Sequence, residues 1–152
     1  MTIQTARPLL RRISAGGSIN PYAIAFILTE RTFRGPVVRV MELLYSGVLI
    51  FIGRSEPRIT IGHSQVSFQF WRFCFGRRNS ALLFGALSLE ASYRVCCLYL
   101  EAHQPQSLRQ MLICYNGKPS QLYASRFIEN LNIVLTLAAS MRIETARMLP
   151  SK

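Results

Sequence analysis

The chain has 152 residues, of which 50% are apolar and 16% are charged, so it is too apolar for a disordered protein and long enough for one domain with its own core. Its 18 Lys and Arg residues outnumber 7 acidic residues, all of them Glu, and the net charge is +11. A positive field of this size favours polyanionic partners such as nucleic acid, anionic lipid or bacterial wall polymer, but it indicates no activity.

Residues 1–17 are expected to form a flexible lead, followed by a single domain over residues 18–147. The lead has neither the apolar stretch nor the cleavage site of a Sec signal peptide. The most apolar segment, residues 43–52, is shorter than the about 20 residues that span a bilayer. We therefore expect no transmembrane span, and a protein acting in the periplasm or cell wall would need an export route other than Sec.

The first helix is predicted over residues 21–34. Asn20 is a favourable N-cap, and Pro21 stands at the first helical position, where its missing N–H costs nothing. Gly35-Pro36 ends the helix, because proline disfavours helical backbone in the residue before it.

The rest of the chain is also mainly helical in pattern. A second helix is predicted over residues 37–52, although the β-branched residues at its end are compatible with a strand as well. Residues 53–63 predict loop and short extended structure. Further helical patterns cover residues 81–89, 92–100, 108–115 and 120–147. The last has an apolar face that should be buried: Leu122, Tyr123, Phe127, Leu131, Val134, Leu135 and Ala138. The sequence therefore predicts an all-α single domain with an irregular central loop region.

The segment over residues 65–75 is rich in aromatic side chains. Phe68 and Phe75 stand three residues before and four after Trp71, a helical spacing typical of core packing. Stacking on nucleic-acid bases, with nearby Arg residues on the phosphates, is the alternative.

The cysteines and histidines show no metal-ligand spacing, and no CxxC pair occurs. We expect buried, reduced thiols, no metal and no cofactor. A thiol–imidazole nucleophile is combinatorially open, but no residue is in place to orient one. The residues concerned are Cys74, Cys96, Cys97, Cys114, His63 and His103.

Glu30 lies on an apolar face of the first predicted helix. Burial disfavours its charged form and raises its pKa, and the nearby helix C-terminus acts in the same direction. A carboxyl group that keeps its proton near neutral pH can protonate a glycosidic oxygen. Three apolar residues share its helix face: Ala23, Phe26 and Ile27, which stand seven, four and three positions before it.

A buried structural ion pair is the competing interpretation of Glu30. Arg34, four residues later, can reach the carboxylate and would lower its pKa. No second carboxylate is near in sequence, so a two-carboxylate glycosidase mechanism would need a partner from elsewhere in the fold.

Three segments occur in an informative order: Glu30-Arg-Thr-Phe-Arg-Gly-Pro36, Ile61-Gly-His-Ser-Gln-Val66, and a third that begins Cys114-Tyr-Asn-Gly117 and continues to Tyr123-Ala-Ser-Arg126. Together they resemble the motif set of the lysozyme-like lytic transglycosylases, the superfamily of soluble lytic transglycosylases and goose-type lysozymes. The resemblance spans roughly residues 20–140.

The resemblance implies a lysozyme-like fold and cleavage of peptidoglycan between N-acetylmuramic acid and N-acetylglucosamine, by lytic transglycosylation or by muramidase hydrolysis. Glu30 would be the single general acid and base. The residues implied in binding substrate and positioning Glu30 are Gly62, Ser64, Gln65, Tyr115, Asn116 and Tyr123.

Two other functions stay open at this point. The first is a noncatalytic basic domain that binds wall polymer or nucleic acid through Arg residues. The second is a protein that acts at membranes through residues 43–52.

Overall fold

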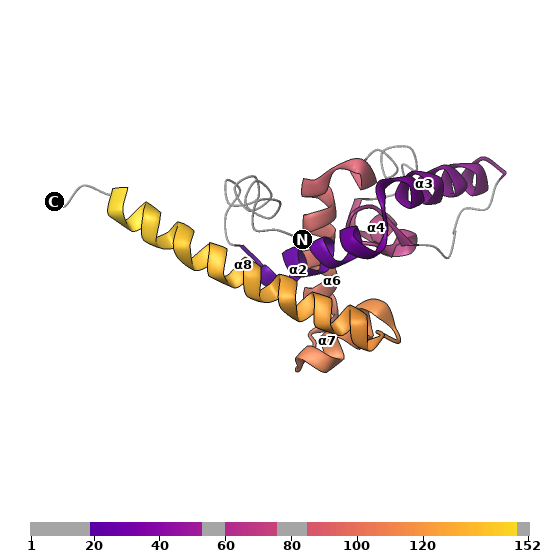
Figure 1. Ribbon diagram of the computed structural model, residues 1–152. Coiled ribbons are helices and arrows are strands. Elements are labelled where there is room, and N and C mark those ends of the chain that lie inside the picture. Colours follow the sequence, from indigo (N-terminus) through magenta and orange to yellow (C-terminus); the bar gives the residue numbers. More distant parts are fainter. Residues whose placement is uncertain (1–18, 53–59, 76–84, 149–152) are drawn as a thin grey trace.

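The computed structural model describes residues 19–52, 60–75 and 85–148. The structure is mostly helical, which confirms the all-α prediction (Figure 1). The expected lead over residues 1–17 lies outside the described residues. The elements, in chain order, are α2 (Pro21–Phe33), α3 (Pro36–Phe51), β1 (Thr60–Ile61), β2 (Val66–Ser67), α4 (Phe68–Phe75), α6 (Leu89–His103), α7 (Leu108–Asn116) and α8 (Gln121–Met148).

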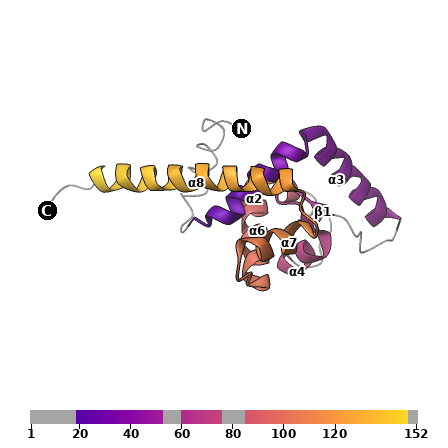
Figure 2. The same ribbon diagram turned by 60° about the horizontal axis from the view of Figure 1, so that its bottom comes forward.

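Helix α2 is the centre of the fold, and it packs most extensively against α8 and next against α6. Every residue from 23 to 30 is buried, as expected for a helix that is apolar on nearly all sides. Figures 1 and 2 show α3 projecting from one side of this assembly and the C-terminal part of α8 projecting from another.

The predicted start of α2 is confirmed in detail. The Asn20 side chain accepts hydrogen bonds from the backbone N–H groups of Tyr22, at 3.1 Å, and Ala23, at 3.2 Å, and Pro21 occupies the first turn. The helix ends at Phe33, with Arg34 as an extended C-cap. This capping fixes where Glu30 lies, because it sets both ends of the helix that carries it.

Residues 36–51 form helix α3, so the predicted second helix is confirmed and the alternative strand at its end is wrong. The pattern predicted over residues 92–100 lies within α6, which begins at Leu89 and has Glu90 in its first turn. Of the pattern predicted over residues 81–89, residues 85–87 are helical but separate from α6, because Ser88 is an extended N-cap between them; residues 81–84 lie outside the described residues. Residues 60–61 and 66–67 pair as a short antiparallel hairpin, β1–β2; its first strand lies within residues 53–63, predicted to be loop and extended, and its second strand follows that segment.

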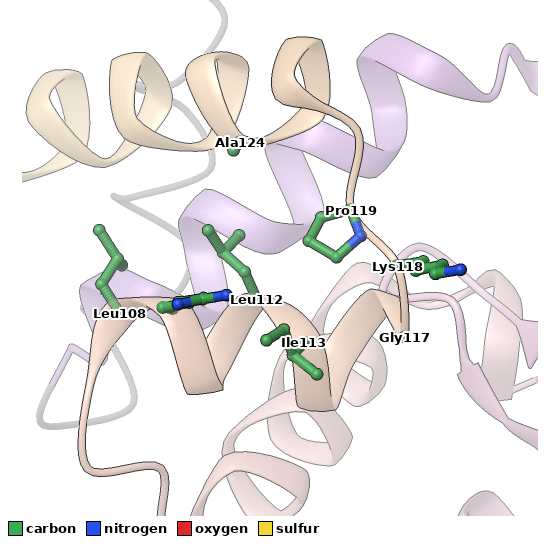
Figure 3. Close-up of a pocket in the computed structure, with 8 residues that line it drawn as sticks. Leu108, Leu112, Ile113, Gly117, Lys118, Pro119 and Ala124 are labelled. Atoms are coloured by element: carbon green, nitrogen blue, oxygen red, sulfur yellow. The ribbon is translucent and has the colours of Figure 1, made fainter.

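The helical pattern predicted over residues 108–115 is confirmed as α7, and capping residues fix both of its ends. Ser107 accepts a hydrogen bond from the Gln110 N–H at 3.2 Å, and Gly117 ends the helix with a φ of +70°. A pocket of about 560 Å³ lies between α7 and the start of α8 (Figure 3). It is lined by Leu108, Arg109, Leu112, Ile113, Gly117, Lys118, Pro119 and Ala124.

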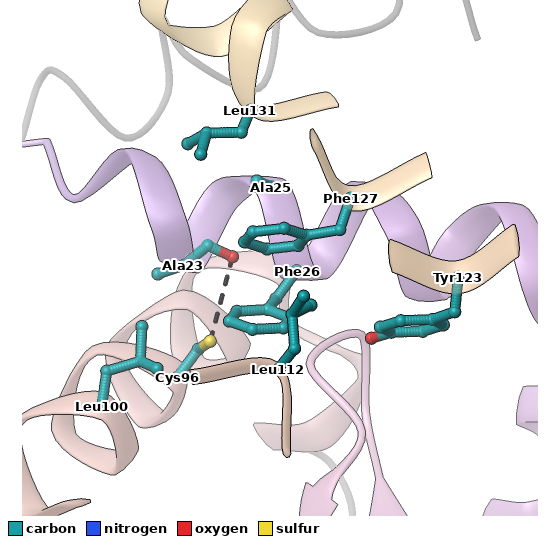
Figure 4. Packing of buried hydrophobic residues seen from close by; sticks show 9 residues of the cluster. All are labelled: Ala23, Ala25, Phe26, Cys96, Leu100, Leu112, Tyr123, Phe127 and Leu131. Carbon is teal, nitrogen blue, oxygen red and sulfur yellow. Dashed lines mark hydrogen bonds between the residues drawn. The ribbon is translucent and has the colours of Figure 1, made fainter. Parts of the chain in front are cut away.

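The core between α2, α6, α7 and α8 is built on Phe26, which contacts Phe127 with ring centroids 4.3 Å apart (Figure 4). A second cluster joins α2 to α8 further along, and a third packs α4 and the hairpin against α6. The buried members drawn in Figure 4 are Ala23, Ala25, Phe26, Cys96, Leu100, Leu112, Tyr123, Phe127 and Leu131.

The core face predicted for α8 is partly wrong. Tyr123, Phe127, Leu131 and Val134 are buried as predicted, but Leu122 and Leu135 are 60% and 48% exposed. Successive residues turn by about 100° around a helix, so these two leucines lie roughly 100° or more away from Tyr123. Leu137 and Asn130 complete the buried face instead.

The core-packing interpretation of α4 is confirmed for Phe68 and Trp71, which are fully buried. The Trp71 and Phe75 rings stack at 5.6 Å. Bases therefore cannot stack on Phe68 or Trp71 without unfolding α4, although Phe73 is 83% exposed.

The prediction of buried thiols is correct for Cys96 and wrong for Cys114. Cys96 is fully buried, Cys74 and Cys97 are half-buried, and Cys114 is exposed; all four are free. Cys114 lies on the outer side of α7, opposite the face that Leu112 buries.

Candidate functional site

Glu30 is 4% exposed and lies in the last turn of α2. Its Oε1 atom accepts a hydrogen bond of 2.6 Å from the hydroxyl of Tyr123, which α8 carries against α2. The periodicity argument for burial of Glu30 is therefore confirmed, and Tyr123 contacts the carboxyl group directly.

Arg34 stands between two carboxyl groups. Its Nε atom is 3.6 Å from Oε2 of Glu30, and its Nη1 atom donates a short hydrogen bond to Oε1 of Glu42. Nη1 also donates to Oε1 of Gln65 at 2.8 Å. The predicted contact between Arg34 and Glu30 is thus present, but the guanidinium hydrogen-bonds to Glu42 and Gln65 rather than to Glu30.

The pKa of Glu30 is raised above its ordinary value. Burial is the largest cause, and the charge of Glu42 raises it further. The Tyr123 hydrogen bond and the charge of Arg34 act in the opposite direction, but they do not outweigh burial. The carboxyl group therefore holds its proton to higher pH than an exposed glutamate.

Glu42 is a member of this cluster that the sequence did not indicate. It comes from α3, beyond the helix break at Gly35-Pro36, and periodicity within one helix cannot relate it to Glu30. Its Oε2 atom accepts from Nε2 of Gln65 at 3.0 Å. No sequence signal would have found it, because the contact depends on the angle between α2 and α3.

Gln65 connects the β1–β2 hairpin to the carboxyl cluster. Its side chain also donates to the carbonyl of Gly62 at 2.9 Å and accepts from the hydroxyl of Thr60 at 2.7 Å. Its φ is +52°, a left-handed conformation that costs a non-glycine residue about 1–2 kcal/mol. This buried side chain, 4% exposed, holds the strained turn together through several hydrogen bonds.

Gly62 and Ser64 shape the same turn, and among the described residues neither hydrogen-bonds to the Glu30 side chain. Gly62 has a φ of +78°, and an added Cβ would lie 3.0 Å from Trp71 Cζ2 and 3.1 Å from both the Ala86 carbonyl and the Ser92 hydroxyl. Ser64 is fully buried, and within the described part of the chain its hydroxyl has no hydrogen-bond partner.

Tyr115 and Asn116, at the end of α7, approach the cluster from the other side. The Tyr115 ring stacks on Phe26 with centroids 3.8 Å apart. Asn116 is exposed, and its side chain lowers the pKa of the nearby Tyr123 hydroxyl. Burial and the charge of Glu30 raise the pKa of Tyr123, so its hydroxyl keeps the proton that it donates to Glu30.

Gln65 and Tyr123 are therefore the predicted site residues that join the cluster around Glu30 directly. Gly62 and Tyr115 support it through the turn and a ring stack, Asn116 acts on the Tyr123 hydroxyl, and Ser64 is buried in the same turn as Gly62. Glu42 and Arg34 complete it.

The histidines do not form a thiol–imidazole pair with the cysteines in the residues that the structure describes. His63 Nδ1 accepts from Arg39 Nη1 at 2.7 Å, and its Nε2 is 3.2 Å from the Leu87 carbonyl. Burial lowers the pKa of His63, and the charge of Arg39 lowers it further, which favours the neutral ring that accepts this bond. His103 Nδ1 lies 2.8 Å from the Tyr99 carbonyl.

Neither the pocket beside α7 nor a second pocket of about 450 Å³ near Asn20 and Tyr93 is lined by Glu30. Across residues 19–52, 60–75 and 85–148, no group of three or more His, Cys or Glu side chains could hold a metal ion. Over the same ranges, no helix combines the length and apolarity needed to cross a bilayer.

Comparisons with protein-family models, with curated proteins and with solved structures find no match to this chain.

Proposed function

We propose that this protein is a lysozyme-like enzyme that cleaves peptidoglycan glycan strands between N-acetylmuramic acid and N-acetylglucosamine, with Glu30 as its general acid and base. The observation that carries the proposal is the Glu30 carboxyl group, 4% exposed, hydrogen-bonded to Tyr123 and with a raised pKa. The resemblance of three segments to lytic transglycosylases supplies the substrate class.

The charge balance around Arg34 favours a protonated Glu30. Two carboxylates and the guanidinium of Arg34 would carry a net charge of −1 in a partly buried place, and the further positive charge of Arg39 has the smallest effect on Glu30. A proton on Glu30 leaves Arg34 and Glu42 as a balanced, hydrogen-bonded pair. The acid form therefore costs less desolvation energy than the ionised form.

In the proposed reaction, the Glu30 carboxyl group gives its proton to the glycosidic oxygen as the bond from that oxygen to muramyl C1 breaks. The resulting carboxylate then takes the proton of the muramyl C6 hydroxyl while O6 bonds to C1, which closes a 1,6-anhydro ring. In a muramidase, water takes the place of O6. Either route uses one carboxyl group at the reacting bond.

Tyr123 and Gln65 are positioning residues in this proposal. Tyr123 occupies one oxygen of the carboxyl group, so the proton is available on the other, Oε2. Gln65 holds Arg34 and Glu42 in one arrangement, which keeps Arg34 from hydrogen-bonding to Glu30. The positive net charge suits an anionic wall polymer, and action would take place in the periplasm or cell wall.

The test is digestion of purified sacculi by the full chain, with mass analysis of the products. Anhydro-muropeptides indicate a transglycosylase, and reducing ends indicate a muramidase. We expect Glu30→Gln to lose product formation while circular dichroism shows a retained fold. Glu129→Gln is the matched control, because Glu129 is an exposed glutamate paired with Arg126 at 2.8 Å. Equal digestion by Glu30→Gln and the wild type would overturn the proposal.

A noncatalytic basic domain that binds wall polymer or nucleic acid is the second candidate. The approach of Arg34 to Glu30, at 3.6 Å, favours it, since it is the contact expected of a structural ion pair. Such a domain should retain RNA, DNA or sacculi with a steep salt dependence, and Glu30→Gln should leave that binding unchanged.

A further inference from the structure

Helix α3 presents its polar side to the rest of the protein. Arg39 donates to His63 at 2.7 Å, and Glu42 contacts Arg34 and Gln65. Ser46 is fully buried, with its hydroxyl 2.6 Å from the Glu42 carbonyl. Arg39 and Glu42 are the charged residues of α3, so both of its charges face inward.

The opposite side of α3 is apolar and open to solvent. At about 100° per residue, its exposed apolar side chains fall within an arc of roughly 160° that contains no charged residue. We call this surface the outer arc of α3. Its members are Val37 (73% exposed), Val38 (48%), Val40 (50%), Met41 (61%), Leu44 (59%), Tyr45 (57%), Val48 (56%), Phe51 (91%) and Ile52 (61%), the last residue following the helix directly.

This orientation is the reverse of that of an ordinary surface helix, whose apolar side faces the core. Helix α3 also projects from the body of the protein, so its outer arc is accessible from outside (Figures 1 and 2). A contiguous apolar surface of this kind marks an interaction site.

We propose that the outer arc of α3 docks on the surface of an anionic lipid membrane, with the helix lying in the plane of the interface. At about 1.5 Å per residue, α3 is roughly 24 Å long, shorter than a span, while its apolar arc and length suit an interfacial helix. This inference is independent of the proposed enzymatic function.

Charge favours a lipid surface as the occupant. The chain carries +11, which attracts it to anionic headgroups and opposes close pairing with a second copy of the same charge. In the sequence, arginines stand on both sides of the apolar segment: Arg31 and Arg34 before it, Arg54 and Arg58 after it. Arg34 hydrogen-bonds to Glu42 within the protein, so Arg31 and the two later arginines are the cations that the sequence offers to headgroups beside this helix, and such basic residues strengthen the binding of an interfacial helix to anionic lipid.

The test is co-sedimentation of the full chain with vesicles of phosphatidylglycerol and phosphatidylcholine, compared with phosphatidylcholine alone. We expect Met41→Glu/Leu44→Glu to weaken partition into the anionic vesicles by about tenfold or more per side chain, since burial of one large apolar side chain is worth roughly that factor. Leu122→Glu/Leu135→Glu is the matched control, because these α8 leucines are 60% and 48% exposed and the charge change is the same.

A second measurement reports insertion without adding charge. Leu44→Trp should show a blue-shifted fluorescence on addition of anionic vesicles, and Leu122→Trp should not; native Trp71 is fully buried and contributes a constant background. No binding, equal loss in both double variants, or no shift for Leu44→Trp would overturn the proposal. So would light scattering that shows a lipid-free dimer which Met41→Glu/Leu44→Glu dissociates, because the occupant would then be a second copy.

Discussion

Removal of the Tyr123 hydroxyl should destabilise the protein by an amount that depends on the protonation of Glu30. In Tyr123→Phe the ring keeps its packing, including its contact with Phe33 at a centroid distance of 5.3 Å, and loses only the 2.6 Å hydrogen bond to Oε1. A hydrogen bond to a charged group contributes about 1.5–3 kcal/mol to the free energy of unfolding, and one to a neutral group about 0.5–1.5 kcal/mol.

The direction in which this loss of stability changes with pH follows from the effect of the hydrogen bond on Glu30. The Tyr123 hydroxyl lowers the pKa of Glu30, so it stabilises the ionised form more than the acid form. At pH below the ordinary Glu value of 4.5, Glu30 is protonated and the loss in Tyr123→Phe should be at the lower end. At pH above the folded-state pKa of Glu30, where the carboxyl group is ionised, the loss should approach about 1.5–3 kcal/mol.

The assay is urea unfolding followed by circular dichroism at both pH values. Tyr99→Phe is the matched control, because the Tyr99 hydroxyl donates to the neutral backbone carbonyl of Cys114 at 2.8 Å. Its loss should be about 0.5–1.5 kcal/mol at either pH. A Tyr123→Phe loss that equals that of Tyr99→Phe and does not change with pH would refute the bond between Tyr123 and Glu30.

Three further outcomes are expected. Gly62→Ala should lower the free energy of unfolding by about 1–3 kcal/mol, because the new Cβ meets backbone and ring atoms and φ is positive. Gly35→Ala is the control and should be nearly neutral, because its new Cβ has nothing within 4 Å; thermal unfolding compares the two variants. Glu42→Gln should lower the pKa of Glu30, since it removes a negative charge and leaves Glu30 as the carboxylate that the Arg34 guanidinium stabilises. The assay is ¹³C NMR titration of the Glu30 carboxyl group. An unchanged or raised pKa would contradict the sharing of Arg34 between the two glutamates. Because the folded-state pKa of Glu30 is raised, its contribution to stability is complete below about pH 4.5 and is lost as pH rises through the folded-state pKa. Glu30→Gln should therefore make the free energy of unfolding depend less on pH. A pH dependence parallel to that of the wild type would count against a raised pKa.

Local patterns predicted the parts of the site that depend on one helix. Asn20, Pro21 and Gly35-Pro36 fix the bounds of α2, and spacing alone places Glu30 on its buried side. The direction of its pKa shift stayed open from the sequence, because burial raises the pKa and Arg34, four residues later, lowers it; in the structure burial is the larger cause. Tyr123 was reached by resemblance rather than by periodicity, since it comes from a helix 93 residues further along the chain.

Relations between elements were not predictable in the same way. Glu42 meets Arg34 because α3, after the break at Gly35-Pro36, lies against β1. Periodicity identified residues 37–52 as a helix with an apolar side but could not say what that side faces. An apolar side is usually buried, yet in α3 the inward side is the polar one, because Glu42 has hydrogen-bond partners there.

Helix α3 therefore has two different sides, one apolar and exposed to solvent and one polar and directed toward the protein. The same rigid α3 holds the apolar outer arc and, on its reverse, the carboxylate of Glu42 that engages Arg34. A displacement of α3 that separates Glu42 from Arg34 would leave Glu30 as the carboxylate beside the guanidinium. The pKa of Glu30 would then fall, and the carboxyl group would lose its proton more readily. The acidity of the buried glutamate is thus sensitive to where an external contact holds α3, and titration of Glu30 with and without such a contact would register it.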